Sequence, residues 1–364
     1  MRQNLFTRYI PMLVIVFIIS FFGGTSVAYA QRPLYKADTL TINVFGDIMM
    51  HAAQIEAAPK GYNKYFCYLE DKIKGADLSI ANMEFTLAGE PYTGYPSFSA
   101  PDEYAEYLAK CGFDIFLCAN NHIYDKGSEG ATRTLEIYKE LSNKYGIRFS
   151  GLAESLEERE KNTPLTVIRK GMKISFLNMT YGTNLGATDH WPKVLYLGEK
   201  STIAKAMTKA KNESDACIVF PHWGDEYELI HSEHQEITAK WLIQEGADMI
   251  IGTHPHVAQD SGIIDGVQVA YSLGNLVSNM SAANTQLGLM ATVKIVRNSD
   301  GDVDLLPLEI THLWCSRPGG LTDSFTVIVI EEFLGKRHLW KNTWDYDKMI
   351  TTYERVRKTH NNEY

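Results

Sequence analysis

Cysteine is scarce in this chain of 364 residues, which contains five of them and no Cys-x-x-Cys pair. The odd number and the missing pair argue against a disulfide scaffold, and a thiolate metal site would need closely spaced pairs. Cys118 and Cys217 stand inside apolar runs, where a free cysteine behaves as a small buried hydrophobe. We therefore expect the cysteines to have packing roles.

Several catalytic and binding signatures are also missing. The sequence has no Gly-rich phosphate loop, no Ser nucleophile elbow and no Cys nucleophile motif, which favours metal-activated water over a covalent intermediate. It has no basic stripe, and its net charge is -9, so nucleic acid is disfavoured as a partner. An acidic surface does not attract polyanions from a distance, so an anionic substrate would have to be held locally, by a metal.

A long apolar run occurs at the N-terminus. Arg2 and Arg8 precede an apolar stretch at 10–22, and small residues follow up to Ala30. This order is typical of a secretory signal peptide, and the stretch is short for a membrane-spanning helix. We predict cleavage after Ala30, with an uncleaved N-terminal anchor as the alternative. In both cases the rest of the chain would lie outside the cytoplasm, as a periplasmic, secreted or membrane-anchored protein.

The remaining pattern predicts an α/β fold, because short apolar runs alternate with helical periodicity. We also expect a helix at 62–74, where apolar and charged residues have helical spacing. The pattern predicts a loop at 89–99 and a hairpin at 165–177. After His256 the strands at 267–273, 289–296 and 303–308 follow one another without helices, which predicts that they complete a second sheet. The other predicted strands are 40–45, 78–81, 114–118 and 217–220, and the predicted helices are 101–110, 128–145, 201–211 and 234–245.

Five apolar runs each end in residue types that bind metals. Ligands in open α/β sheets sit beyond the carboxyl ends of the strands, so five such ends predict one shared site. Carboxylates and imidazoles together suit Mn, Zn or Fe. Taken singly, Asp47 could instead be a helix N-cap and Glu84 a solvated loop residue; as a ligand, Glu84 could bridge two ions. The runs are 41–47, 77–84, 114–122, 216–224 and 248–256.

Histidines supply the rest of the predicted site. His222, His254 and His256 are candidate ligands, and the last two need a turn, which Pro255 favours, to face one centre. His51, four residues after Asp47, is a further candidate ligand. His231 and His234 are expected at a solvated helix start.

The run from Asn120 to Asp125 is the most distinctive. The amide oxygen of Asn121 would be a weak ligand, leaving His122 to act as general acid with Asp125 orienting its ring. The alternative is an Asn-rich turn.

The combined motifs resemble those of the capsule-synthesis protein CapA family, which is associated with poly-γ-glutamate biosynthesis and is similar in fold to calcineurin-like metallophosphoesterases. The resemblance covers about 40–312. It implies a four-layer α/β/β/α sandwich with two divalent metal ions. The motifs are 45–47, 81–84, 119–127, 222–227, 252–259 and 271–275.

The resemblance also implies a ligand set, with His122 as the general acid. The wider phosphoesterase pattern has a His two residues after its first Asp and a Gly-Asp pair at the second strand, so His51 and Asn82 depart from it. The chain thus divides into a signal peptide (1–30), the CapA-like domain (40–312) and an extension of unassigned role (313–364). The implied ligands are Asp47, Glu84, Asn121, His222, His254 and His256.

Two functions remain open at this point. The first is a metal-dependent hydrolase that cleaves a phosphoester or an amide in a cell-envelope polymer or its precursor. The second is a non-catalytic component that binds polymer within a capsule assembly or export complex, together with membrane proteins. A complete ligand set with a free His122 favours the first, and the family's link to polymer synthesis favours the second.

Overall fold

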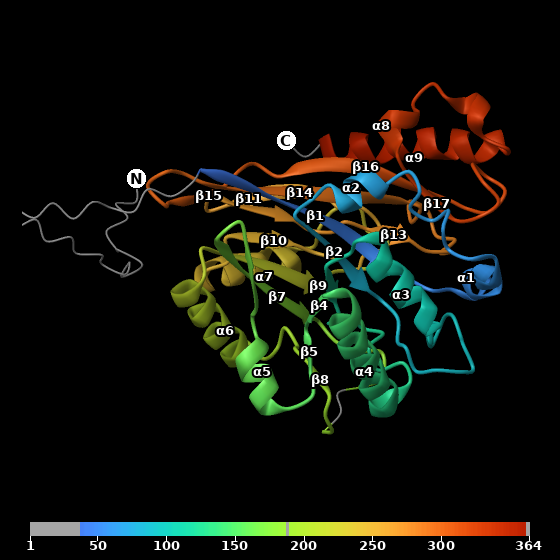
Figure 1. The fold of residues 1–364 in the computed structure, drawn as a ribbon. Coiled ribbons are helices and arrows are strands. Elements are labelled where there is room, and N and C mark those ends of the chain that lie inside the picture. The colour runs from blue at the N-terminus through green and yellow to red at the C-terminus, as the bar shows by residue number, and fades with distance from the viewer. Residues whose placement is uncertain (1–36, 187–188, 362–364) are drawn as a thin grey trace, which may run out of the picture.

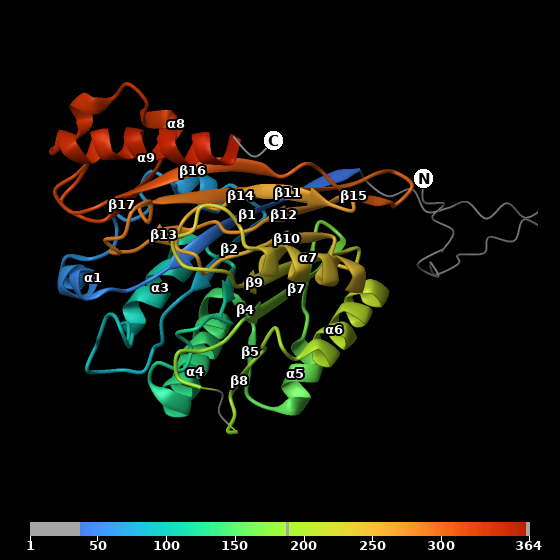
Figure 2. The same ribbon diagram turned by 180° about the vertical axis from the view of Figure 1, so that it is seen from behind.

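The computed structural model describes residues 37–186 and 189–361. Two stacked sheets lie between helices (Figures 1 and 2). The predicted signal peptide lies outside the described residues. Within the described ranges, no helix combines the length and the apolar character needed to cross a bilayer.

The larger sheet has nine strands and contains the first three of the predicted ligand-bearing runs. Its order is β17-β16-β14-β1-β2-β3-β4, with β13 paired to β1 and β15 paired to β14. β1 to β4 are parallel, whereas β14 runs antiparallel to β1. The strands are β1 Asp38–Ile48, β2 Leu78–Met83, β3 Ile115–Leu117, β4 Arg148–Ser150, β13 Asn275–Val277, β14 Leu287–Arg297, β15 Val303–Leu305, β16 Glu309–Ser316 and β17 Thr326–Val329.

The smaller sheet has six strands in the order β11-β12-β10-β9-β7-β6 and carries the other two ligand-bearing runs. β7, β9, β10 and β12 are parallel, and β6 and β7 form the predicted hairpin. The strands are β6 Leu165–Arg169, β7 Met172–Thr180, β9 Ala216–His222, β10 Met249–Ile251, β11 Ser261–Ile264 and β12 Val267–Ala270, with a separate pair, β5 Leu152–Ala153 and β8 Lys193–Val194.

One prediction about the sheets is wrong. The strands after His256 do not complete one second sheet, because β12 joins the six-stranded sheet, whereas β14 pairs with β1 and β15 with β14 in the larger sheet. β14 pairs with β1 from Asp38↔Arg297 to Phe45↔Met290. This long-range pairing places β14 against a strand that is about 250 positions earlier in the chain, which no local pattern specifies.

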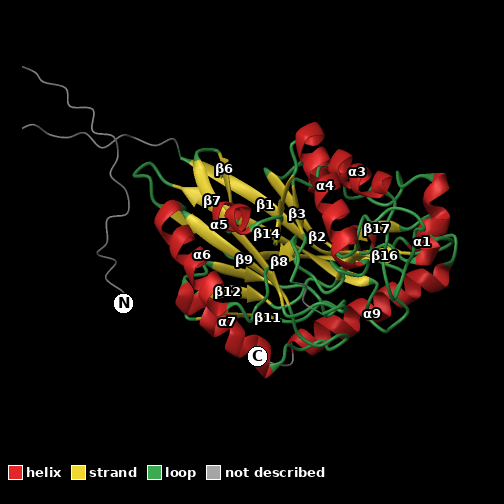
Figure 3. Cartoon of the chain, turned by 90° about the horizontal axis from the view of Figure 1, so that it is seen from below, coloured by secondary structure: helices red, strands yellow, loops and turns green. Residues whose placement is uncertain are grey.

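Helices cover the outer faces of both sheets, as Figure 3 shows from below. Outside the larger sheet, α3 and α4 bury Tyr104 and Tyr138 against Phe116, and outside the smaller sheet α6 and α7 pack on β9 and β10. The layers are therefore α/β/β/α, as predicted. The helices are α1 Ala52–Ala57, α2 Glu70–Lys74, α3 Asp102–Cys111, α4 Gly127–Tyr145, α5 Leu156–Asn162, α6 Lys200–Glu213, α7 Glu233–Glu245, α8 Ile330–Phe333 and α9 Thr343–Asn361, with 3-10 turns at Ala58–Lys60 and Arg337–Leu339.

The segment 62–74 is less helical than its spacing predicts, since only α2 forms a helix there. Tyr62, Tyr65, Phe66 and Leu69 are instead buried in turns against the outer helices and β17. Burial of these large side chains outweighs a weak helical propensity. The packing role predicted for Cys118 and Cys217 is confirmed, since both are buried, whereas Cys67 is exposed.

The C-terminal segment continues the same fold. The boundary placed after 312 falls inside β16, and β17 extends the larger sheet. α9 buries Met349 and Val356 in the cluster that also lies between the two sheets. Figure 1 shows α9, in red, lying along β16. The extension is therefore packed against the sheet that carries the site.

Candidate metal centre

The carboxyl ends of strands from both sheets converge on one cluster of buried acids and histidines. Two groups of three residues have ligand atoms that all lie within 4.8 Å of one another. The first group is Asp47, Glu84 and His222, and the second is Glu84, His254 and His256. All of these side chains are buried. Glu84 belongs to both groups, so its carboxylate would be shared if each group held an ion.

Tight backbone approaches hold these side chains in place. The Asp47 amide donates a hydrogen bond to the Gly274 carbonyl over 2.9 Å, and a Cβ at Gly46 would lie only 1.8 Å from that same oxygen. Gly46 is therefore needed for β1 to reach β13. His254 and His256 both have positive φ, 103° and 59°, a strained conformation for bulky residues. The turn that brings both rings to one centre thus lies in the histidines themselves.

Glu84 is the least compensated group of the site. Both of its carboxylate oxygens are buried without a hydrogen-bond partner, as is Nδ1 of His254. Burial, followed by repulsion from Asp47, raises the pKa of Glu84 well above its usual value. An unpaired buried carboxylate is costly, and divalent cations would remove that cost. The donor set of carboxylates and imidazoles therefore fits divalent transition metal ions.

Two of the histidines, His222 and His254, are held in the neutral form that binds metals. Burial, followed by the neighbouring His256 and His122, lowers the pKa of His254 to about 3. Burial, followed by His254, lowers the pKa of His222 well below its usual value. A neutral imidazole offers a lone pair to a cation without first losing a proton.

Hydrogen bonds from outside the cluster orient these ligands. Asn82 Nδ2 donates to Asp47 Oδ1 over 2.7 Å. Nδ1 of His222 lies 2.9 Å from Thr253 Oγ1, and Nδ1 of His256 lies 3.0 Å from Asn275 Oδ1. Since the amide oxygen of Asn275 can only accept, Nδ1 of His256 carries the proton and Nε2 is left to bind a cation.

His122 and Asp125 form a pair beside the acids. Nδ1 of His122 lies 2.7 Å from Asp125 Oδ2, and its Nε2 lies 3.9 Å from Glu84 Oε1. Asp125 Oδ2 also accepts from the Phe98 amide over 2.7 Å, and the Phe98 ring packs edge-on against His122. The carboxylate therefore holds the ring by one nitrogen and directs the other toward the cluster.

Two of the predicted ligands, Asn121 and His51, differ in their position relative to the cluster. Asn121 Oδ1 lies 2.8 Å from His222 Nε2, inside the cluster. His51 is at the N-terminus of α1, where Nδ1 accepts from the Asn279 amide over 3.2 Å. Burial is the main cause that lowers its pKa to about 4. His51 belongs to neither close group of ligand atoms, so the structure places it next to the cluster, with only Nε2 left for a cation.

Sequence reasoning missed one side of the site. The ring of Tyr181, which is half exposed, lies 4.6 Å from the His254 ring, and the Asn184 amide donates to the Asn121 carbonyl over 2.8 Å. Both residues lie in the loop that follows β7, which does not end in a run of ligand types like those of the five predicted strands. His231 also differs from expectation, since it pairs with Asp260 at 2.7 Å and stacks on Tyr271, whereas His234 is exposed as predicted.

Two stacked sheets between helices, with acids and histidines at the strand ends, define a metallophosphoesterase-like α/β sandwich. A solved structure of a Staphylococcus aureus protein assigned as a 5′-nucleotidase, in complex with alpha-ketoglutarate, shares this fold with a TM-score of 0.51 and 12% sequence identity. The similarity covers 75% of this chain and 54% of the other, so the chain spans about half the length of that structure.

The sequence identifies the family within this class. Residues 41–280 match the family described as bacterial capsule synthesis protein PGA_cap, and the chain belongs to it. The capsule biosynthesis protein CapA of Bacillus anthracis is 27% identical over 83% of this chain and 75% of its own length. The PGA biosynthesis protein CapA of Bacillus subtilis (strain 168) is 26% identical over 82% of this chain and 79% of its own.

Proposed function

We propose that this protein is a hydrolase that uses two divalent transition metal ions, Mn, Zn or Fe, in capsule or poly-γ-glutamate biosynthesis. It acts outside the cytoplasm on a phosphoester or an amide of a cell-envelope polymer or its precursor. The biosynthetic role is supported by the names of the two Bacillus relatives, and the chemistry by the ligand cluster.

One observation carries the proposal. Glu84 belongs to both groups of ligand atoms, and neither of its oxygens has a hydrogen-bond partner. A purely structural carboxylate at this depth would be expected to accept hydrogen bonds. Two cations flanking Glu84 would account for both facts.

The protein's own groups have distinct tasks in such a reaction. Asp47, Glu84, Asn121, His222, His254 and His256 would hold the ions, which supply an activated water and polarise the bond to be cleaved. His122 gives a proton from Nε2 to the leaving group. Asp125 accepts a hydrogen bond from the Nδ1–H of His122, which stabilises the charged ring and keeps Nε2 directed toward the cluster.

Metal analysis of the purified mature chain, followed by a hydrolysis screen with phosphoesters and peptide amides, tests this function. We expect metal in the protein as isolated, turnover of at least one substrate class, and loss of turnover with a chelator that is reversed by adding Mn, Zn or Fe. A metal-free protein that hydrolyses nothing after reconstitution would instead support the alternative, a polymer-binding component of a capsule assembly complex with membrane proteins.

The location outside the cytoplasm is a separate part of the proposal and rests on the charged, apolar and small-residue order of residues 2–30. N-terminal sequencing of native protein is expected to begin near Gln31. An intact Met1 in a membrane fraction would support the uncleaved anchor, and an intact Met1 in the cytosol would refute export.

A further inference from the structure

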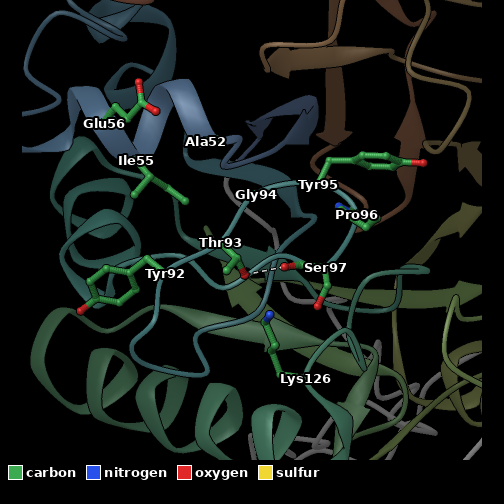
Figure 4. Close-up of a pocket in the computed structure, with 10 residues that line it drawn as sticks. All are labelled: Ala52, Ile55, Glu56, Tyr92, Thr93, Gly94, Tyr95, Pro96, Ser97 and Lys126. Carbon is green, nitrogen blue, oxygen red and sulfur yellow. Dashed lines mark hydrogen bonds between the residues drawn. The ribbon is translucent and has the colours of Figure 1, made fainter.

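A cavity of about 490 Å³ lies between α1 and the loop 89–99. Its volume is in the range of small-molecule sites. Ile55 of α1 and Tyr92 of the loop contribute to its lining, and Lys126 lines it just before α4 (Figure 4). The proposed reaction assigns no task to this space.

Among the described residues, Lys126 is a cationic side chain of the cavity that has no ion-pair partner. It is half-buried, and within the part of the chain that the structure describes its amine forms no hydrogen bond and no ion pair. Arg133, which lines an adjoining cavity together with Lys126, is instead held by both oxygens of Asp102 at 2.7 Å. Figure 4 shows the Lys126 amine directed toward the turn formed by Thr93 and Ser97. A half-buried, unpaired ammonium group favours an anionic ligand.

The wall of the cavity is tied to the proposed acid. Ser97 Oγ donates to the Asp125 carbonyl and the Phe98 amide to the Asp125 carboxylate, each over 2.7 Å. Phe98 packs edge-on against His122 with ring centres 4.7 Å apart. Ser97, which lines the cavity, is therefore fixed to the same residue that holds His122, and its neighbour Phe98 contacts the His122 ring.

We propose that this cavity is a subsite for an acidic polymer, in which Lys126 binds the carboxylate of a residue next to the bond cleaved at the metal centre. The cleavage part rests on the proposed function, whereas the binding part does not. Because the chain carries a net charge of -9, a polyanion needs such a local cation. Glu56, exposed on the α1 side of the same cavity, would repel the carboxylate and limit its affinity.

Calorimetric titration of the full mature chain with a short glutamate oligomer, and with a glutamine oligomer of the same length, tests the subsite. We expect the glutamate oligomer alone to bind, and Lys126→Met to weaken it about tenfold or more, as the loss of one charge-assisted contact predicts. Lys126→Arg should retain most of the affinity. Lys211→Met, which makes the same charge change on the exposed face of α6, should match wild type.

Glu56→Gln is a second probe that does not depend on the Lys126 variant being folded, and it should tighten binding. Four outcomes would each overturn the subsite. They are no binding by wild type, equal affinity of wild type and Lys126→Met, weaker binding by Glu56→Gln, and displacement of the oligomer by inorganic phosphate as readily as by free glutamate oligomer. Lys126-dependent binding without any hydrolysis would support the subsite and reject the proposed reaction. The two ideas therefore fail separately.

Discussion

At the scale of single residues, Glu84 is the side chain of the site whose buried charge bound cations would stabilise most. Its two carboxylate oxygens accept no hydrogen bond. The nearest imidazole nitrogens, Nε2 of His222, His256 and His122, lie 3.6, 3.7 and 3.9 Å from Oε1, which is beyond hydrogen-bond distance. The pKa of Glu84 is raised by burial and by Asp47. The same carboxylate that would hold two ions must therefore destabilise the metal-free fold whenever it is ionised.

Glu84→Gln is expected to stabilise the metal-free protein in a pH-dependent manner. A raised pKa in the folded state gives stability that is fully present below the unfolded value of 4.5 and is lost as the pH rises through the folded value. With a chelator present, the Tm of wild type should fall relative to the variant as the pH increases from about 5 to about 8. With metal, the order should reverse, because the variant loses its shared ligand. Parallel Tm curves in chelator would contradict this account.

His122 and His254 should respond differently to substitution by alanine. His122→Ala is expected to lower turnover by about 10²–10⁴, the usual loss for a general acid, with little change in metal content, because Nδ1 of His122 is bound to Asp125. His254→Ala should reduce metal content, since its ring belongs to one of the ligand groups. Elemental analysis and kinetics on the same preparations decide this. Equal metal loss in both variants would make His122 a ligand.

At the scale of elements, the site depends on a contact between two strands that is too close for any side chain larger than that of glycine. β1 meets β13 through Gly46 and Gly274, and Asp47 follows directly. The ligand turn after β10 has two histidines with positive φ, each of which costs about 1–3 kcal/mol. Packing of the two sheets, rather than local preference, holds this backbone in place.

Gly46→Ala is expected to damage both stability and metal binding. The new methyl group would meet the Gly274 carbonyl, and overpacking of this kind costs about 1–3 kcal/mol. The shift of β1 would also displace Asp47. Thermal unfolding and metal content should both decrease. Gly198→Ala is the matched control, because nothing lies within 4 Å of its added Cβ; a similar loss there would show that the effect is not due to the β1–β13 contact.

At the scale of the whole molecule, the C-terminal segment stabilises the sheet that carries the site. Asp345 of α9 is buried and accepts hydrogen bonds from Ser316 Oγ over 2.6 Å and Trp340 Nε1 over 3.0 Å. These contacts join α9 to the end of β16. The segment is thus part of the folding unit even though the family match ends at 280.

Asp345→Ala is expected to lower the free energy of unfolding by about 2–4 kcal/mol, because it leaves buried donors without an acceptor. Metal content of the folded fraction should not change, since the residue lies outside the ligand groups. Asp347, also on α9, forms a solvent-exposed ion pair with Arg337. Asp347→Ala should change the free energy of unfolding little, because water screens this pair. Denaturant titration compares the two. Equal stability of both variants would show that α9 docking contributes little.

The sequence by itself determined which residues could meet and what chemistry they could do. Short Val- and Ile-rich runs form buried strands wherever they occur, and the acids and histidines that follow Phe45, Phe220 and Ile251 lie at strand ends for that local reason. The alternation of strands with helices, the loop at 89–99 and the pairing of His122 with Asp125 were predictable in the same way, since each depends on neighbours in the chain.

Only the tertiary structure decided how these parts combine. Strand pairing across about 250 residues placed β14 beside β1, and burial kept 62–69 out of a helix. The packing of the chain also decided that Glu84 belongs to both ligand groups, that His51 lies next to them, and that Lys126 faces a cavity. Local patterns record periodicity and residue type, whereas these outcomes depend on contacts between distant segments, whose free energy exists only once the sheets have packed.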